Sequence, residues 1–338
     1  MSAGLHAIRN SAALSRQGET AVVRVTGEHA WDLLDRELTC DLYLRDGQAR
    51  SALLLHEDGR VQADVTVLCA DETFWLLVDG APGAGVSARL TAARGADEDV
   101  TVSVEEGLTV VGLDGPFAWE VLAALEGRGV IGLPLMSFFT MDRGPLCLRD
   151  GRHGEFGYRF VLSASEADDL LRALSERANS VGVPLGLATA RDRATCMLEN
   201  HVFCVGREGQ SDLDAGELQL GWRLSADKDA PGLAAARRGA AGGRRTVTFR
   251  ADDDIEDLNV RLADVVVGSV LAWERCSHGP GVVGLAALTR ELAHPGIGAL
   301  SAGGVSLRTV SPPLIANRSL YVNPQHHRYV DRDAIGLP

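Results

Sequence analysis

The sequence predicts an α+β protein of more than one domain with an antiparallel β-barrel at its C-terminal end. The chain has 338 residues, which is more than a single hydrophobic core usually organises. Helix-like and strand-like patterns are mixed through the first two thirds, but only short β-rich segments separated by Gly, Pro and Asp follow residue 245. A small, basic, Gly-rich stretch, AAARRGAAGGRR, lies between them at residues 234–245. We therefore expect one region over residues 1–235 and a barrel domain over residues 245–338.

The first region is expected to alternate strands and helices. A strand-like AVVRVTG run precedes EHAWDLLDREL, whose apolar residues recur at helical spacing. Two strand-like runs, residues 52–55 and 61–67, flank the turn-forming HEDG segment and predict a β-hairpin. SEADDLLRALSERAN is the clearest amphipathic helix. Further strands are expected at residues 73–78 and 109–113, and further helices at residues 86–93, 118–125 and 188–197. The barrel strands are expected in TVTFR, NVRLAD, VVVGSVLAWE, VVGLAAL and VSLRTV.

Composition indicates a cytoplasmic protein whose main partners are neither nucleic acid nor membrane. The 46 acidic and 33 basic residues give a formal net charge of −13, without a long run of either sign. The longest apolar runs are far shorter than the roughly 20 residues that span a bilayer. Residues 1–17 lack the basic start and apolar run of a secretory signal. The six cysteines are scattered without a C-x-x-C pair, which favours reduced thiols and no metal site.

Asp64 is the first candidate site residue. No G-x-S-x-G, H-E-x-x-H, Walker loop or strand-linked G-x-G-x-x-G occurs, so hydrolase, zinc-protease and nucleotide-binding classes lack support. Asp64 lies among alternating apolar residues, so in a strand it faces away from them. It is then either an ordinary exposed strand aspartate or a pocket carboxylate that pairs with a ligand nitrogen.

Glu199 is the second candidate, because its surroundings are apolar. A carboxylate there costs several kcal/mol unless it is paired or hydrogen-bonded. The adjacent N–H donors of a pterin ring would satisfy both oxygens. A surface position, or a salt bridge to Arg191 or Arg193, is the alternative. The segment GEFGY, residues 154–158, is by itself a turn that enters a strand.

Taken together, these segments resemble the aminomethyltransferase, or glycine-cleavage T-protein, family. LLLHEDGRVQADVTV is similar to its L-x-x-x-D/E-G-G-x-x-x-D strand pair, and VVGLDGPFAWEVL to L-Q-G-P-x-A-x-x-V-L. GEFGYRFVL resembles G-E-D-G-Y-E-L-Y-V, and RATCMLENHVFCVG resembles R-D-T-L-R-L-E-A-G-L-x-L-Y-G. ELQLGWRLSADK and the later VVVGSVLAWERCSHGPGVVGLAAL follow in the family's order. The resemblance implies two interleaved α+β subdomains around a central folate channel, followed by the barrel.

The resemblance also implies roles for individual residues. Asp64 becomes the acidic residue beside the folate nitrogens N5 and N10, and Glu199 the carboxylate that binds the pterin. Further pocket positions carried over from the family are Tyr158, Glu217, Trp222, Arg223 and Lys228. Lys228 or Arg223 would meet the glutamate tail of folate, whereas Tyr158 and Glu155 are more often structural.

The sequence departs from the family at three pocket positions. Cys40 replaces an Asn, and Arg152 and Val205 each replace a Tyr, which argues for a specialised substrate rather than glycine. His56, beside the hairpin turn, is a candidate proton-transfer group, although an exposed turn histidine is the commoner case.

The implied activity is transfer of a one-carbon unit between tetrahydrofolate and a small-molecule donor or acceptor, with a carrier protein left open. The alternatives are a folate-binding protein without catalysis, and a family member that has lost folate and acts on a substrate in the old pocket. The first alternative is disfavoured because the K-G-C-Y-x-G-Q-E motif of the family's non-catalytic branch is missing.

Overall fold

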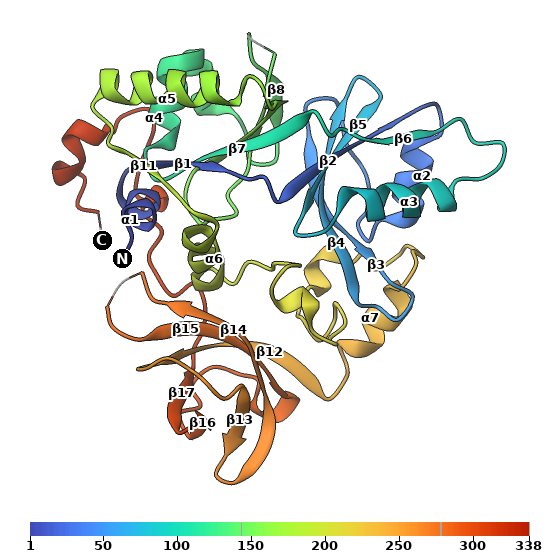
Figure 1. Ribbon diagram of the computed structural model, residues 1–338, viewed down its shortest axis with the longest axis vertical. Helices are drawn as coiled ribbons and strands as arrows, with labels where there is room; N and C mark the ends of the chain where they lie inside the picture. The colour runs from blue at the N-terminus through green and yellow to red at the C-terminus, as the bar shows by residue number, and fades with distance from the viewer. Residues whose placement is uncertain (143, 278, 338) are drawn as a thin grey trace.

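The protein folds into three lobes around a central segment, as the computed structural model shows (Figure 1). The structure describes residues 1–142, 144–277 and 279–337. One lobe is built on a six-stranded sheet, the second on a five-stranded sheet, and the third is a closed barrel of six strands. The predicted α+β class and the C-terminal antiparallel barrel are confirmed. None of the helices in the described residues is long and apolar enough to span a membrane.

The six-stranded sheet forms the first lobe together with the helices α1 (Ala3–Asn10), α4 (Ala118–Glu126) and α5 (Ala167–Val181). Its strands, in spatial order, are β11 (Leu185–Leu187), β1 (Ala12–Arg16), β7 (Leu108–Asp114), β10 (Gly157–Ser163), β9 (Leu146–Arg149) and β8 (Phe138–Thr140). α4 and α5 bury their apolar faces with β7 and β10 in one core that includes Phe117, Phe160 and Leu174. The predicted amphipathic helix is therefore α5.

The five-stranded sheet forms the second lobe, covered by α2 (Ala30–Glu37) and α3 (Gly83–Ala93). Its strands, in spatial order, are β3 (Ala49–Leu55), β4 (Val61–Ala70), β5 (Thr73–Asp79), β2 (Thr20–Thr26) and β6 (Thr101–Val104). β3 and β4 are the predicted hairpin. The chain leaves the first sheet after β1, builds all five strands of the second, and returns to the first with β7, so the two sheets are interleaved. A shared apolar core joins them, in which Leu68 and Leu77 pack with Leu148 and Val161.

The central segment begins with α6 (Ala190–Glu199) and continues through short helical turns to α7 (Leu233–Gly239). It lies between the two sheets and the barrel (Figure 1). The stretch at residues 234–245 is not an open linker, because α7 occupies its first half and β12 (Arg244–Ala251) starts at its end. Ala236 is fully buried against Leu55 and Leu213, which explains why a run of small residues forms a packed helix here.

The barrel closes where its first strand, β12, pairs with its last, β17 (Val305–Thr309). The strands between them around the barrel are β15 (Val282–Thr289), β14 (Val265–Arg275), β13 (Asn259–Leu262) and β16 (Leu300–Ala302). After Thr309 the chain leaves the barrel and returns to the first lobe, where the ring of Tyr329 packs edge-on against Phe117 at a centroid distance of 5.2 Å. The barrel domain expected over residues 245–338 therefore includes a tail that packs elsewhere.

Candidate functional site

A cavity of about 960 Å³ lies where the two sheets, the central segment and the barrel meet. β3 and β4 contribute Arg50 and Asp64 to its wall, and the loop before β10 contributes Arg152. The opposite side comes from the chain that follows α6, and Leu285 of the barrel completes it. The volume is near the upper end of the roughly 300–1,000 Å³ typical of small-molecule sites.

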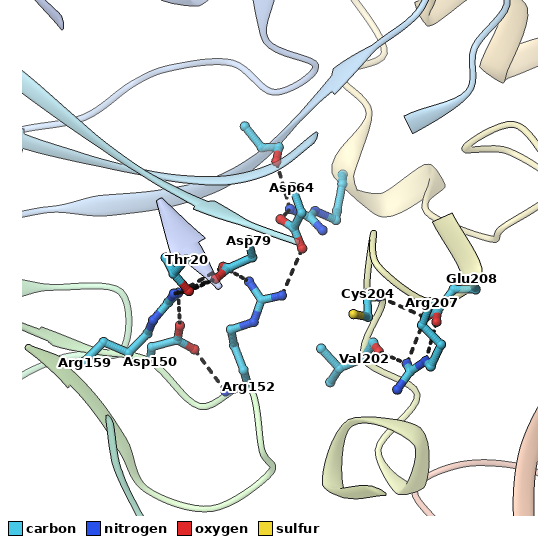
Figure 2. Close-up of polar contacts among 12 residues, drawn as sticks. Thr20, Asp64, Asp79, Asp150, Arg152, Arg159, Val202, Cys204, Arg207 and Glu208 are labelled. Carbon is cyan, nitrogen blue, oxygen red and sulfur yellow. Dashed lines mark hydrogen bonds and ion pairs between the residues drawn. The ribbon is translucent and has the colours of Figure 1, made fainter. Parts of the chain in front are cut away.

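Asp64 is held in the cavity wall by two arginines. Only 1% of its surface is exposed. Oδ1 accepts from Nη2 of Arg223 at 2.5 Å, and Oδ2 accepts from Nη2 of Arg152 at 3.0 Å. Figure 2 shows Arg152 reaching between Asp64 and Asp79. The interpretation of Asp64 as an exposed strand aspartate is wrong, because the side chain is buried in the cavity wall.

The register of β4 and β5 explains why a cation is needed at Arg152. Asp64 lies directly opposite Asp79 in this ladder, and two carboxylates so placed repel each other. Nη1 of Arg152 donates to Asp79 at 2.8 Å while Nη2 binds Asp64, so one guanidinium bridges both. Arg159 binds the far side of Asp79 at 2.6 Å and also contacts Asp150 at 3.3 Å. The result is a buried ionic network that ties β10 and its preceding loop to the second sheet.

The network keeps the Asp64 and Asp79 carboxylates ionised. Burial by itself raises the pKa of Asp64, but the positive charges of Arg223 and Arg152 outweigh burial and the net pKa is lowered. The same balance, with Arg159 and Arg152 as the cations, lowers the pKa of Asp79 well below its usual range. Asp64 is therefore a fixed negative charge at neutral pH and a weak proton acceptor.

A second ion pair lies in the cavity wall beyond α6. Glu208 is 3% exposed, and its carboxylate accepts from the backbone N–H of Cys204 at 2.9 Å and from the guanidinium of Arg207. Arg207 also donates to the carbonyl of Val202, which fixes the loop (Figure 2). Because Arg207 and Glu208 neutralise each other, this wall presents polar groups without net charge.

Of the residues predicted for the site, Asp64, Trp222 and Arg223 line the cavity. Trp222 is 79% exposed, and its ring centroid lies 5.7 Å from the guanidinium carbon of Arg223. Arg223 is 7% exposed and donates to the carbonyl of Ala52 as well as to Asp64. A short 3-10 turn, Gly221–Arg223, sets the two side chains next to each other.

Glu199 is not where its predicted role requires it. Its carboxylate is 2% exposed and is not part of the cavity wall, although its neighbour Leu198 is. Oε2 accepts from Nη2 of Arg9 at 2.7 Å, and Oε1 accepts from the backbone N–H of Ser277 at 2.8 Å. The pterin-binding interpretation is therefore corrected. The salt-bridge alternative holds, but with Arg9 of α1 as the partner.

Four other predicted residues also lie outside the cavity wall. Tyr158 is 1% exposed in the core of the first lobe, where burial raises the pKa of its hydroxyl. His56, which follows β3, is exposed, as the turn-histidine alternative expects, and it is not part of the described cavity wall. Glu217 pairs with Arg244 at 3.1 Å. Lys228 donates to Asp35 at 2.9 Å and to the carbonyl of Cys40, so two of its three ammonium donors are used within the protein.

Sequence reasoning missed most of the ionic network. Asp79 directly follows the strand predicted at residues 73–78, and a hairpin drawn out in register from Asp64 would have revealed the two facing carboxylates. Arg152 differs from the Tyr of the family, and nothing local in the sequence signals Arg159 or Asp150. Arg50 and the Arg207–Glu208 pair carry no sequence signal because charged residues of this kind are normally solvated.

Comparisons with known proteins agree with this architecture. The family described as "GCVT N-terminal domain" matches residues 1–228. An aminomethyltransferase of Chlorobaculum parvum is 31% identical over 230 residues, covering 66% of this chain and 62% of the relative. An aminomethyltransferase of Chloroherpeton thalassium is 30% identical over 225 residues, covering 64% and 60%. The chain thus spans less than two thirds of the length of these relatives.

A solved structure shows the same fold over nearly the whole chain. Glycine cleavage system aminomethyltransferase T from Bartonella henselae superposes with a TM-score of 0.82, covering 93% of this chain and 89% of that one. The sequences are 20% identical in this match, so it bears on the fold alone. Because the family's conserved pattern covers more than half of the sequence, the chain belongs to the GCVT N-terminal domain family.

Proposed function

We propose that this protein binds tetrahydrofolate in the central cavity and transfers a one-carbon unit between it and a small molecule. The observation that carries the proposal is the position of Asp64, an ionised carboxylate in the wall of a cavity of about 960 Å³. Family membership and the name of the curated relatives, aminomethyltransferase, support it. The specialised substrate predicted from the departures at Cys40, Arg152 and Val205 is part of the same proposal.

Several features of the cavity fit tetrahydrofolate, a flat pterin joined to an aromatic ring and a charged tail. Apolar side chains such as Leu44, Val202 and Leu220 line much of the wall. Arg50, also in the wall, is an exposed cation suited to the carboxylates of the tail.

With Glu199 outside the wall, Glu208 is the carboxylate we assign to the pterin. An ionised carboxylate has about four acceptor sites, and three donors from Cys204 and Arg207 already use Glu208. One site is left for an N–H of the ring. Asp150, also in the wall, accepts from the backbone N–H of Arg152 and from the guanidinium of Arg159, and it belongs to the ionic network around Asp64 and Asp79.

Asp64 acts in this proposal as a fixed negative charge. Tetrahydrofolate, when bound, supplies the nitrogens that accept or release the one-carbon unit. A carboxylate with a lowered pKa is a poor general base, so Asp64 stabilises positive charge that develops nearby and does not remove the proton. Arg152 and Arg223 hold it in place, which removes the cost of reorganisation during the reaction.

A second candidate function is a reaction without folate, on a substrate in the same cavity. The displacement of Glu199 into an ion pair with Arg9 favours it, because the carboxylate expected to recognise the pterin is occupied by the protein. The three carboxylates in the described wall, those of Asp64, Asp150 and Glu208, are also each paired with an arginine.

Titration with tetrahydrofolate under anaerobic conditions separates the two candidates. We expect saturable quenching of tryptophan fluorescence, because Trp222 lines the cavity. Incubation with a panel of N-, O- and S-methyl compounds should then yield methyl-tetrahydrofolate and the demethylated compound by mass spectrometry. Absence of binding would reject the first candidate and favour the second.

Asp64→Asn tests the role of the carboxylate. We expect this variant to bind tetrahydrofolate but to lose turnover, since the amide carries no charge. Asp58→Asn is the matched control, because Asp58 lies on the same hairpin in an exposed ion pair with Arg60. Full activity in a folded Asp64→Asn protein would discard the assigned role.

A further inference from the structure

Arg223 has a buried donor that the protein leaves without a partner. The residue is 7% exposed, and its Nη2 donates to Asp64 and to the carbonyl of Ala52. Its Nε is buried and has no hydrogen-bond acceptor among the described residues. An unsatisfied buried donor costs about 1–3 kcal/mol, and more for a charged group. Since Arg223 lines the cavity, a bound molecule is in position to supply the missing acceptor.

The cavity wall also carries a surplus of positive charge. Three carboxylates, those of Asp64, Asp79 and Asp150, face three guanidinium groups, those of Arg152, Arg159 and Arg223. Arg207 and Glu208 neutralise each other. Arg50 remains, and it forms no ion pair with any part of the chain that the structure describes. One unpaired cation in the wall contrasts with a formal net charge of −13 for the whole chain, so the cavity favours an anion locally.

Trp222 places a flat apolar surface beside the guanidinium of Arg223. Its ring is 79% exposed although it lines the cavity, and its centroid is 5.7 Å from the guanidinium carbon. A flat ligand that covers a large exposed aromatic ring buries apolar area and stacks on the ring. The two neighbouring side chains thus offer a cation and a planar surface to one molecule.

We propose that the cavity takes a substrate in which a carboxylate lies next to a flat, apolar group, with the carboxylate on Arg223 and the flat group against Trp222. That this molecule reacts in the cavity rests on the proposed function, whereas its binding to Arg223 and Trp222 does not. A carboxylate is the best match because its first oxygen can accept from Nε while its second oxygen binds water.

The glutamate tail of folate is a second source of the same chemistry. Arg223 shares Asp64, which is 1% exposed, so its free donor lies deep in the wall. A flexible tail with two charges is better solvated at the cavity mouth than in such a place. We therefore assign the carboxylate at Arg223 to the substrate and leave the tail to Arg50.

Isothermal titration calorimetry with benzoate and benzamide tests the inference on the full-length protein. The two probes have the same ring and nearly the same shape, but only benzoate carries the charge. We expect benzoate to bind at least tenfold more tightly. Equal affinity for the two probes would overturn the inference.

Arg223→Gln should remove the preference for benzoate. Arg172→Gln is the matched control, because it removes the same charge from an exposed arginine of α5. An equal loss in the control would show nonspecific attraction and would also overturn the inference. If Arg223→Gln does not fold, Arg223→Lys provides the test, because it keeps the charge but lacks Nε, and the preference should still fall. Trp222→Ala should weaken both probes by the same factor, and unchanged affinities would remove Trp222 from the site.

A competition experiment distinguishes the two sources of carboxylate. We expect benzoate to bind with undiminished affinity in the presence of saturating tetrahydrofolate. Displacement by tetrahydrofolate, but not by a tetrahydropterin without the glutamate tail, would assign Arg223 to the tail and overturn the substrate proposal. If tetrahydrofolate does not bind at all, the proposed function fails while the benzoate result still stands or falls by itself.

Discussion

Nη2 of Arg9 lies 2.7 Å from Oε2 of Glu199, in an ion pair whose side chains are both 2% exposed. Arg9 belongs to α1 and Glu199 ends α6, so the pair joins the N-terminal helix to the central segment. Oε1 of Glu199 accepts from the backbone of Ser277, which brings the barrel into the same contact. Glu199 is thus a structural joint between lobes.

We expect Glu199→Gln to destabilise the fold without changing ligand affinity. Removing one partner of a buried ion pair leaves the other charge uncompensated and costs about 3–5 kcal/mol. Urea denaturation should show this loss, whereas the dissociation constant for tetrahydrofolate should stay within about twofold, less than 0.5 kcal/mol. Glu274→Gln, in an exposed pair with Arg191, is the control and should change little. A selective loss of folate affinity in a stable Glu199→Gln protein would restore the pterin-binding role.

Arg152→Met should destabilise the protein more at neutral than at acidic pH. Without the guanidinium, Asp64 and Asp79 face each other across β4 and β5, so the pKa of the pair rises. At pH 7 both stay charged and repel, and the expected loss is about 3–5 kcal/mol. As pH falls toward 5, one of them takes up a proton and the deficit shrinks. Denaturation at both pH values measures it, with Arg24→Met as an exposed control. An equal deficit at both pH values would contradict the bridging role.

His201 should make the stability of the protein fall on mild acidification. Burial lowers the pKa of His201, whereas the unfolded chain takes up this proton near pH 6.5. The folded state therefore binds fewer protons, so its stability is fully present above about pH 6.5 and is lost as pH falls toward the lowered folded pKa. His201→Asn should flatten the melting temperature between pH 7 and pH 5, and Asn tolerates the positive φ of 55° at this position. The exposed His326→Asn variant serves as the control, and identical slopes in wild type and His201→Asn would refute this assignment.

Glu155→Gln should release the C-terminal tail from the first lobe. Its two carboxylate oxygens accept from the backbone N–H groups of Arg318 and Ser319 at 3.0 and 2.7 Å. An amide in the same place offers one acceptor and sets its NH2 against the other N–H group. Limited digestion with trypsin should cut after Arg318 several-fold faster in the variant. Glu166→Gln, at an exposed position, controls for the charge change, and unchanged cleavage would show that other contacts hold the tail.

Local sequence patterns determined the elements and one site residue of this protein. The period-two alternation and the HEDG turn fixed the β3–β4 hairpin, and the same alternation put Asp64 on the face opposite its apolar neighbours. Short β-rich segments with turn residues between them determined the barrel strands. These features depend on neighbours within about ten residues, and such interactions can be inferred from the order of side chains alone.

Only the tertiary structure decided which charges meet. Glu199 and Arg9 are 190 positions apart, and Arg223 reaches Asp64 across 159. Which group pairs with a buried charge depends on how the three lobes pack around that charge. The sequence alone does not distinguish among several arginines as the partner. For Glu199, the nearby Arg191 and Arg193 instead bind Glu274 and Glu19. The charge pattern of the cavity therefore follows from packing between distant segments, because electrostatic pairing in a low-dielectric interior depends on distances that a linear sequence does not contain.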